Sequence, residues 1–161
     1  MKQELYITPN PFDNLLLTSE EGELTGISFY PSTKIDDGKR NPSFSIIRKW
    51  LDEYFAGLNP SWRPQYQYKA HSKFQKEVSD ILLSIPYGMT ITYGKIAATI
   101  AENRGMKRMS SQAVGGALRN NPLVILLPCH RVIGANGKMV GFHGGVKNKI
   151  ALLALEKAVL L

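Results

Sequence analysis

The only cysteine of the sequence lies in a setting that suits a nucleophile. Cys129 stands between Pro128 and His130, and Arg131 follows. The thiolate is the reactive form of cysteine, and both an imidazole and a positive charge nearby favour it. In an extended strand Cys129 and His130 would point to opposite faces, so they can interact only if the backbone turns, which Pro128 favours. The pattern predicts a cysteine nucleophile with a histidine base; a small buried hydrophobe is the alternative.

A carboxylate near the end of the chain is the second candidate. We expect a last helix over residues 146–160, on which Glu156 lies in an apolar stripe. Burying an unpaired carboxylate is costly, so Glu156 should pair with an imidazole or a guanidinium. The alternative is a frayed helix end from which Glu156 reaches solvent. The helical neighbours that define the stripe are Leu152, Leu153, Val159 and Leu160.

The composition favours a folded, basic protein. The chain has 161 residues, of which 43% are hydrophobic, so it can bury a core as one compact unit or two small lobes. Twenty Lys and Arg against 13 Asp and Glu give a net charge of +7 at pH 7. Such a field attracts polyanions, and nucleic acid is the partner we expect. A basic surface that is merely solvated is the alternative.

Several classes of protein are disfavoured. One cysteine cannot form an internal disulfide or a cysteine-rich zinc site, and we expect neither a metal nor a cofactor. A site of histidine and carboxylate ligands stays open, because the chain also holds His71 and His143. Residues 1–7 lack the apolar stretch of a secretory signal, and the apolar runs 123–127 and 150–155 are far shorter than the ~20 residues that span a bilayer. We therefore expect a cytoplasmic protein without membrane contact.

The pattern along the chain predicts an α+β fold of two lobes. Residues 14–18 and 24–30 are β-rich runs separated by a polar, glycine-containing segment, which predicts a hairpin. A helix capped by Ser43 should follow. From residue 72 the pattern becomes helical, beginning with a capping box at Ser72. We expect a small N-terminal α/β lobe that contains a sheet, residues 1–70, and a mostly helical C-terminal lobe, residues 71–161.

Two short helices of the second lobe have the order of a helix-turn-helix. Thr92 can cap the first, and the second should start near Ser110 or Ser111. The second helix should stop before Pro122, because proline disfavours the helical conformation at Asn121.

The second of these helices is poor in side chains. Gly115 and Gly116 each lower helix stability by about 1 kcal/mol relative to alanine, so something should approach this surface closely. One explanation is tight packing on a neighbouring helix. The other is a helix thin enough to enter a DNA groove, which the nearby Lys107, Arg108 and Arg119 favour because they can meet phosphates.

Two motifs resemble a known family. Residues 128–133, PCHRVI, preceded by residues 113–122, AVGGALRNNP, resemble the active-site signature of the O6-alkylguanine-DNA alkyltransferases, also called methylated-DNA-protein-cysteine methyltransferases. The resemblance runs from about residue 72 to Glu156, whereas residues 1–70 are similar only in length and texture. It implies DNA repair in which the alkyl group of O6-alkylguanine moves to Cys129 once, without turnover. Transfer from O4-alkylthymine stays open.

The same resemblance implies roles for individual residues. His130 would act through a water as the base toward the thiol, Glu156 would hold and polarise His130, and Asn121 would orient the active-site backbone. Tyr93 would protonate the departing guanine and help the nucleotide swing out. The nucleotide must leave the duplex because its target carbon lies inside a base pair. The residues implied to line the pocket for the flipped base are Met139, Val140, Phe142, His143 and Gly144.

The mode of DNA binding is implied as well. The thin helix, residues 111–120, would enter the minor groove of double-stranded DNA, where sequence information is degenerate. We expect a monomer that is associated with the nucleoid. The implied DNA contacts are Thr92, Gly94, Ser110, Ser111, Gln112, Gly115, Arg119 and Ala135.

Three features depart from the family pattern. Gln112 stands where many relatives carry an intercalating arginine, Phe142 stands where a tyrosine is usual, and the connection over residues 102–109 is longer than in some relatives. The rival functions are an alkyltransferase-like protein that binds lesions without transfer and a helix-turn-helix regulator. The presence of Cys129 argues against the first. A regulator would need neither the run of residues 128–131 nor a second helix flattened by glycines.

Overall fold

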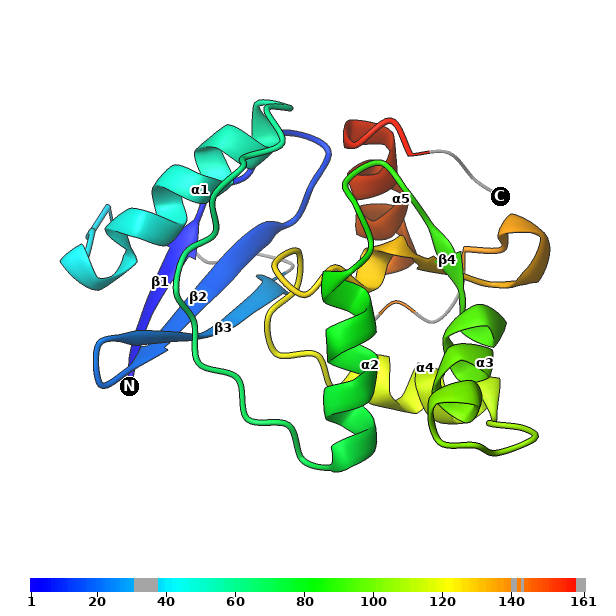
Figure 1. Ribbon diagram of the computed structural model, residues 1–161. Helices are drawn as coiled ribbons and strands as arrows, with labels where there is room; N and C mark the ends of the chain where they lie inside the picture. The colour runs from blue at the N-terminus through cyan, green and yellow to red at the C-terminus, as the bar shows by residue number, and fades with distance from the viewer. Residues whose placement is uncertain (31–37, 140–141, 143, 159–161) are drawn as a thin grey trace. The chain divides into compact units, whose positions relative to one another are not determined.

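A computed structural model of the protein describes residues 1–30, 38–139, 142 and 144–158. The chain forms two compact units: Met1–Lys69 with Pro122–Val124, and Ala70–Asn121 with Ile125–Leu161. One contains an antiparallel sheet and a helix, and the other is mostly helical (Figure 1). The α+β fold expected from the sequence is confirmed.

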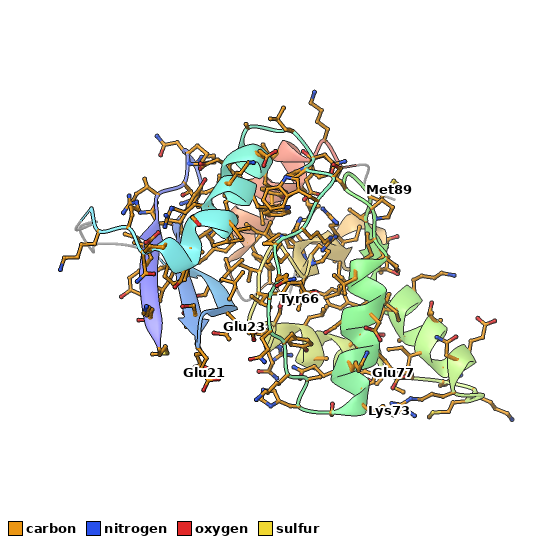
Figure 2. All side chains as sticks on the ribbon, turned by 60° about the vertical axis from the view of Figure 1, so that its left-hand side comes forward. Glu21, Glu23, Tyr66, Lys73, Glu77 and Met89 are labelled. Atoms are coloured by element: carbon orange, nitrogen blue, oxygen red, sulfur yellow. The ribbon has the colours of Figure 1, made fainter. Side chains whose placement is uncertain are left out.

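The first unit is built on a three-stranded antiparallel sheet in the order β1-β2-β3. The predicted hairpin joins β2 to β3 through Glu21 and Gly22, which both have positive φ, as tight hairpin turns require. Figure 2 shows Glu21 and Glu23 at this end of the hairpin. Leu15 and Leu17 alternate into the core from β2. The strands are β1 (Lys2–Tyr6), which the sequence analysis missed, β2 (Asn14–Glu20) and β3 (Glu23–Tyr30).

One helix, α1 (Ser45–Phe55), lies beside the sheet (Figure 1). The Tyr6 hydroxyl donates to Asp52 over 2.6 Å, which joins β1 to α1. The predicted cap at Ser43 was wrong. A 3-10 turn (Pro42–Phe44) precedes α1, and the Asn41 side chain caps it by accepting from the Ser43 backbone, because Pro42 already begins the turn.

Three residues from later in the chain belong to this first unit. The Ile27 backbone donates to the Pro122 carbonyl over 2.9 Å and accepts from the Val124 backbone over 3.1 Å, so the segment Pro122–Val124 pairs with β3. Directly afterwards Ile125 has φ 73°, a conformation that is strained for a β-branched side chain. Backbone hydrogen bonds therefore hold the segment that ends five residues before Cys129.

The second unit contains four helices within its described residues, together with a short parallel pair of strands. Thr92 caps α3 by accepting from the Lys95 backbone, which confirms the predicted cap. Ser110 caps α4 by accepting from the Ala113 backbone, so α4 starts where the sequence predicted, near Ser110 or Ser111. Helices α3 and α4 pack together in the order of a helix-turn-helix. The elements are α2 (Lys73–Leu83), β4 (Ile91–Thr92), α3 (Tyr93–Asn103), α4 (Ser111–Arg119), β5 (Val132–Ile133) and α5 (Val146–Leu155).

The last helix is shorter than predicted. It ends at Leu155, Glu156 forms its C-cap, and Lys157 has φ 52°. The apolar pattern continues beyond this point, but the left-handed Lys157 breaks the helix. Glu156 is therefore a helix-terminal residue. In the described part of the chain, none of the helices has the length and apolar character to cross a membrane.

The cap of α2 gives a test of this local structure. The Ser72 hydroxyl accepts from the Gln75 backbone over 3.1 Å. Ser72→Ala should lower the free energy of unfolding by about 1 kcal/mol, because it leaves a helix-terminal N–H without its side-chain acceptor. Urea denaturation measures this, with Ser72→Asn as the matched control that keeps an acceptor. An equal loss in both variants would contradict the capping role.

Candidate active site

The backbone turns sharply at the cysteine. Pro128 has φ −78° and ψ 63°, and the Cys129 backbone donates to the Leu127 carbonyl over 2.7 Å, the geometry of an inverse γ-turn. A 3-10 turn, Cys129–Arg131, follows at once. The turn expected at Pro128 is thus present, and successive side chains from Cys129 do not alternate as they would in a strand.

Glu156 is the anchor of a buried cluster. Its side chain is fully buried at the end of α5 and accepts hydrogen bonds from three residues. His130 Nε2 lies 2.7 Å from Oε2, Arg131 Nε and Nη2 donate over 2.8 and 3.1 Å, and the Gly88 backbone donates over 3.2 Å. The pairing expected for Glu156 is therefore observed, with an imidazole and a guanidinium at once.

The cluster keeps Glu156 ionised. Burial alone would raise the pKa of this carboxyl, but the hydrogen bonds and charges of His130 and Arg131 outweigh burial and hold the pKa well below its ordinary value. Gly88 is required beside it. It has φ 81°, and a Cβ there would lie 3.2 Å from the Glu156 carbonyl oxygen.

His130 is a neutral imidazole with a defined free nitrogen. Burial lowers its pKa, and the carboxylate of Glu156 only partly opposes this. Because a carboxylate only accepts hydrogen bonds, Nε2 carries the ring proton and Nδ1 carries the lone pair. Among the described residues the buried Nδ1 has no hydrogen-bond partner, so it makes no direct hydrogen bond to the thiol. This nitrogen can accept a proton through a bridging water.

Asn121 holds the thiol. Its Nδ2 donates to Cys129 Sγ over 3.0 Å and to the Leu127 carbonyl over 2.8 Å. Cys129 is 5% exposed, and burial raises its pKa to about 11 against the lowering effects of Asn121 and Lys149. The thiol is therefore protonated at neutral pH, and forming the thiolate needs a base.

The roles of two positively charged side chains differ from the sequence prediction. Arg131 was expected to favour the thiolate, but its guanidinium is paired with Glu156 and donates to the Ile85 carbonyl over 2.8 Å. The charge that acts on Cys129 is Lys149, which the sequence analysis missed. A signal was available, because Lys149 lies seven residues before Glu156 and therefore on the same face of α5.

An open groove of about 600 Å³ runs beside this site. It lies between the start of α3 and the helix α4. Seven of the eight residues expected to contact DNA line it, whereas the eighth, Ser110, caps α4. Tyr93 lies in the groove too, as the first residue of α3. The lining residues are Thr92, Tyr93, Gly94, Ser111, Gln112, Gly115, Arg119 and Ala135.

The glycines of α4 are not explained by packing inside the protein. A Cβ at Gly116 would meet no atom within 4 Å, and a Cβ at Gly115 would meet only the Tyr93 ring, at 3.9 Å. Both are ordinary or open distances. Tight packing on a neighbouring helix therefore does not explain these two glycines. The surface of α4 at Gly115 and Gly116 has room for a partner.

The expected base pocket is described in part. Met139 and Gly144 are half-buried and Phe142 is 9% exposed, while Val140 and His143 lie outside the described residues. The Gly144 carbonyl accepts from the Asn148 side chain over 2.7 Å. A pocket role for these residues stays a prediction. In the described ranges no three His, Cys, Asp or Glu side chains gather to hold a metal ion.

Comparison with known proteins shows the family of this chain. The sequence profile described as 6-O-methylguanine DNA methyltransferase, DNA binding domain, matches residues 73–158. The chain is 35% identical to the methylated-DNA–protein-cysteine methyltransferase of Mycobacterium leprae, over 92% of this chain and 88% of that protein. It is 37% identical to the protein of the same name from Methanosarcina acetivorans, over 93% and 96%. The chain belongs to the 6-O-methylguanine DNA methyltransferase family.

Structural comparison agrees with this family. A crystal structure of Mycobacterium tuberculosis OGT in complex with DNA matches with a TM-score of 0.78 and 36% identity, covering 96% of this chain and 92% of that one. The resemblance drawn from residues 113–122 and 128–133 is confirmed. In this methyltransferase the matched DNA-binding domain contains Cys129, the Glu156 cluster and the groove along α4.

The ion cluster predicts a pH-dependent stability. Glu156→Gln should lower the free energy of unfolding at pH 7 by about 3 kcal/mol, because it leaves Arg131 buried without its anion. Since the folded-state pKa of Glu156 is lowered, its contribution is complete above the unfolded pKa of about 4 and is lost as the pH falls below it. The difference between wild type and variant should therefore shrink in acid. Denaturation at several pH values measures both effects.

A matched control is Glu77→Gln. Glu77, labelled on α2 in Figure 2, pairs with Arg104 at the surface, where solvent screens the charges, and its loss should change stability little. If the two variants lose equal stability at pH 7, the buried cluster is not the stabilising element.

Proposed function

We propose that this chain repairs DNA by moving an alkyl group from O6-alkylguanine to its own Cys129, once per molecule. The observation that carries the proposal is a buried thiol held by Asn121 beside a neutral imidazole whose far nitrogen is fixed on Glu156. Family membership supports the same reaction. O4-alkylthymine is a further candidate substrate.

The first step makes the nucleophile. The thiol proton of Cys129 passes through a water to His130 Nδ1, which is the lone-pair nitrogen because Glu156 holds the other. Glu156 stabilises the imidazolium that forms, and the amide of Asn121 donates to the sulfur as it gains charge. A thiol with a raised pKa gains most from such a base, since little thiolate exists beforehand.

The second step moves the alkyl group. The sulfur attacks the alkyl carbon, the S–C bond forms, and the bond from carbon to guanine O6 breaks with its electron pair on the base. Tyr93 donates its phenolic proton to the purine and then regains one from solvent, to which His130 returns the thiol proton. Burial raises the pKa of Tyr93, so the phenol is protonated and can donate. The products are S-alkylcysteine and guanine.

The groove is the proposed DNA surface. The charge of the chain is concentrated in the unit that contains it: twelve Lys and Arg against four Asp and Glu, compared with eight against nine in the other unit. Lys107, Arg108 and Arg119 are exposed around α4. We propose that a monomer inserts α4 into the minor groove and that Gln112 fills the space left by a flipped nucleotide.

The proposed function assigns a role to each lobe of the chain. Residues 71–161 would form the DNA-binding and alkyl-acceptor domain, and residues 1–70 the supporting α/β lobe. Met139, Val140, Phe142, His143 and Gly144 would line the base pocket. Action on chromosomal DNA in the nucleoid, within the cytoplasm, stays a prediction.

Intact-mass spectrometry tests the reaction. After mixing with duplex DNA that contains O6-methylguanine, the protein should gain the mass of one methyl group, on the peptide with Cys129, and no more on longer incubation. Cys129→Ser should gain nothing and still bind the duplex, because serine preserves the size of the side chain. Lesion binding by the wild type without a mass gain would instead indicate a binding protein, and binding without lesion preference a regulator.

Gly116 tests the docking of α4. Gly116→Ala and Gly116→Leu should each raise helix stability by up to about 1 kcal/mol, since both are better helix formers than glycine and a Cβ has open space there. The affinity for DNA should fall with side-chain size, about tenfold or more for leucine, because the added atoms enter the groove contact. Fluorescence anisotropy in a Cys129→Ser background measures binding without transfer. Equal affinities for glycine, alanine and leucine would contradict the thin-helix interface.

A further inference from the structure

A second cavity lies in the mostly helical unit, apart from the thiol. It has a volume of about 470 Å³ and is lined by the end of α2, the segment that leads into β4, the first turn of α3 and β5. Cys129 is not among its lining residues, and it shares Thr92 with the groove along α4. A cavity of this size with mostly apolar walls is typical of small-molecule sites. The apolar lining residues are Ile85, Pro86, Met89, Ile91 and Ile133.

Hydrogen bonds of the active-site cluster hold the walls of this cavity. The Ile85 carbonyl accepts from Arg131 over 2.8 Å. The Gly88 backbone donates to Glu156 over 3.2 Å, which holds the turn that carries Met89. The strands β4 and β5 pair in parallel, so the residues that they contribute are fixed as well. The cavity is therefore formed before a ligand arrives, and binding does not have to order its walls.

The charge in the lining of this cavity is positive. Lys95 is exposed in the first turn of α3, and its side chain forms no ion pair with any described residue. The N-terminus of α3, a helix of 11 residues, adds a partial positive charge at the same place. None of the described residues that line the cavity is acidic. The other polar lining residues carry hydroxyl groups, which can accept or donate: Ser84, Thr90 and Thr92.

The two kinds of lining residue select one kind of ligand. Met89, labelled in Figure 2, is 42% exposed, so apolar surface of the cavity is open to water, whereas Ile133 is 0% exposed. An apolar group that covers this surface gains free energy by removing it from water. An inorganic anion would meet Lys95 and leave the apolar wall wet, and a neutral hydrocarbon would leave Lys95 without a partner. A molecule with an apolar body and one negative charge satisfies both.

We propose that this cavity is a second ligand site, which binds a small organic anion with an apolar body, such as an aromatic carboxylate or sulfonate. The body packs against Ile85, Met89 and Ile133, and the anionic group meets Lys95 at the N-terminus of α3. The site is separate from the pocket proposed for the flipped base. Its existence does not depend on the proposed alkyl transfer.

Fluorescence titration of the folded, full-length protein with anilinonaphthalene sulfonate tests the site. One saturable site is expected. Met89→Asp should weaken binding by about tenfold or more, because it places a carboxylate in the apolar wall beside an anion. Lys95→Met should weaken binding by about threefold, the effect of one exposed ion pair, and Lys95→Arg should retain the affinity. The uncharged phenylnaphthylamine, which has the same apolar body, should bind more weakly and should not respond to Lys95→Met.

Met106→Asp is the matched control, because Met106 is also an exposed methionine and does not line the cavity. It should leave dye binding unchanged, and equal losses in the two methionine variants would overturn the proposal. Equal affinity of the charged and uncharged dyes would contradict an anion site. Duplex DNA should bind Met89→Asp no worse than Met106→Asp, since both add one negative charge. A selective loss of DNA affinity in Met89→Asp would assign the cavity to the DNA surface instead.

NMR of the wild-type protein locates the dye without any substitution. Backbone amide shifts should change at residues 84–95 and at Ile133, which line or flank the cavity. Shifts centred on α4 would place the dye in the neighbouring groove and refute the second site. Neither measurement uses lesion DNA or alkyl transfer. A protein that takes no methyl group would therefore count against the proposed function and leave this site standing.

Discussion

The geometry of the active site depends on the carboxylate of Glu156. It lies at the C-terminal end of α5, where the helix dipole disfavours negative charge, and it is fully buried. Arg131 compensates both costs by donating to both carboxylate oxygens, and this leaves Glu156 ionised and able to hold His130 Nε2. The orientation of the imidazole and its tautomer follow from this buried ion pair, whereas burial is what lowers the pKa of His130. Because Arg131 also donates to the Ile85 carbonyl, the same interaction connects the end of α2 with the end of α5.

Asn121 lies between two different parts of the site. On one side lies the buried cluster of Glu156, His130 and Arg131, which we propose generates the nucleophile. On the other lies α4, which has little side-chain volume at Gly115 and Gly116. Asn121 follows α4 by two residues and donates to Cys129 Sγ, so the end of the proposed DNA-binding helix is coupled directly to the sulfur.

The first unit holds the segment Pro122–Val124 by backbone pairing, and it adds little to the net charge of the protein. The segment Pro122–Val124 adds to β3 at Ile27, between Asn121 and the strained Ile125. The cost of the left-handed conformation at Ile125 is of order 1–3 kcal/mol, which the surrounding hydrogen bonds and burial must offset. The unit has almost no net charge of its own, with eight basic and nine acidic residues, so its contribution to DNA attraction is small. Within this unit the pairing fixes the conformation of Pro122–Val124 against β3.

The sequence by itself determined what depends on local order: the cap at Thr92, the start of α4 near Ser110, the hairpin at Gly22, the glycine-rich helix, and the motif around Cys129 that resembles the family. These are set by propensities and by neighbours within a few residues. Only the tertiary structure decided that Arg131 pairs with Glu156 and that the buried Lys149 donates to the Val132 carbonyl, next to the turn that contains Cys129. It also ended α5 at Leu155, although the apolar period continues, and added β1, which lacks a strong pattern. The sequence alone does not show which charged side chain will be buried or which partner it will have. The cost of burying a charge, and the partner that offsets it, arise only when distant segments pack together.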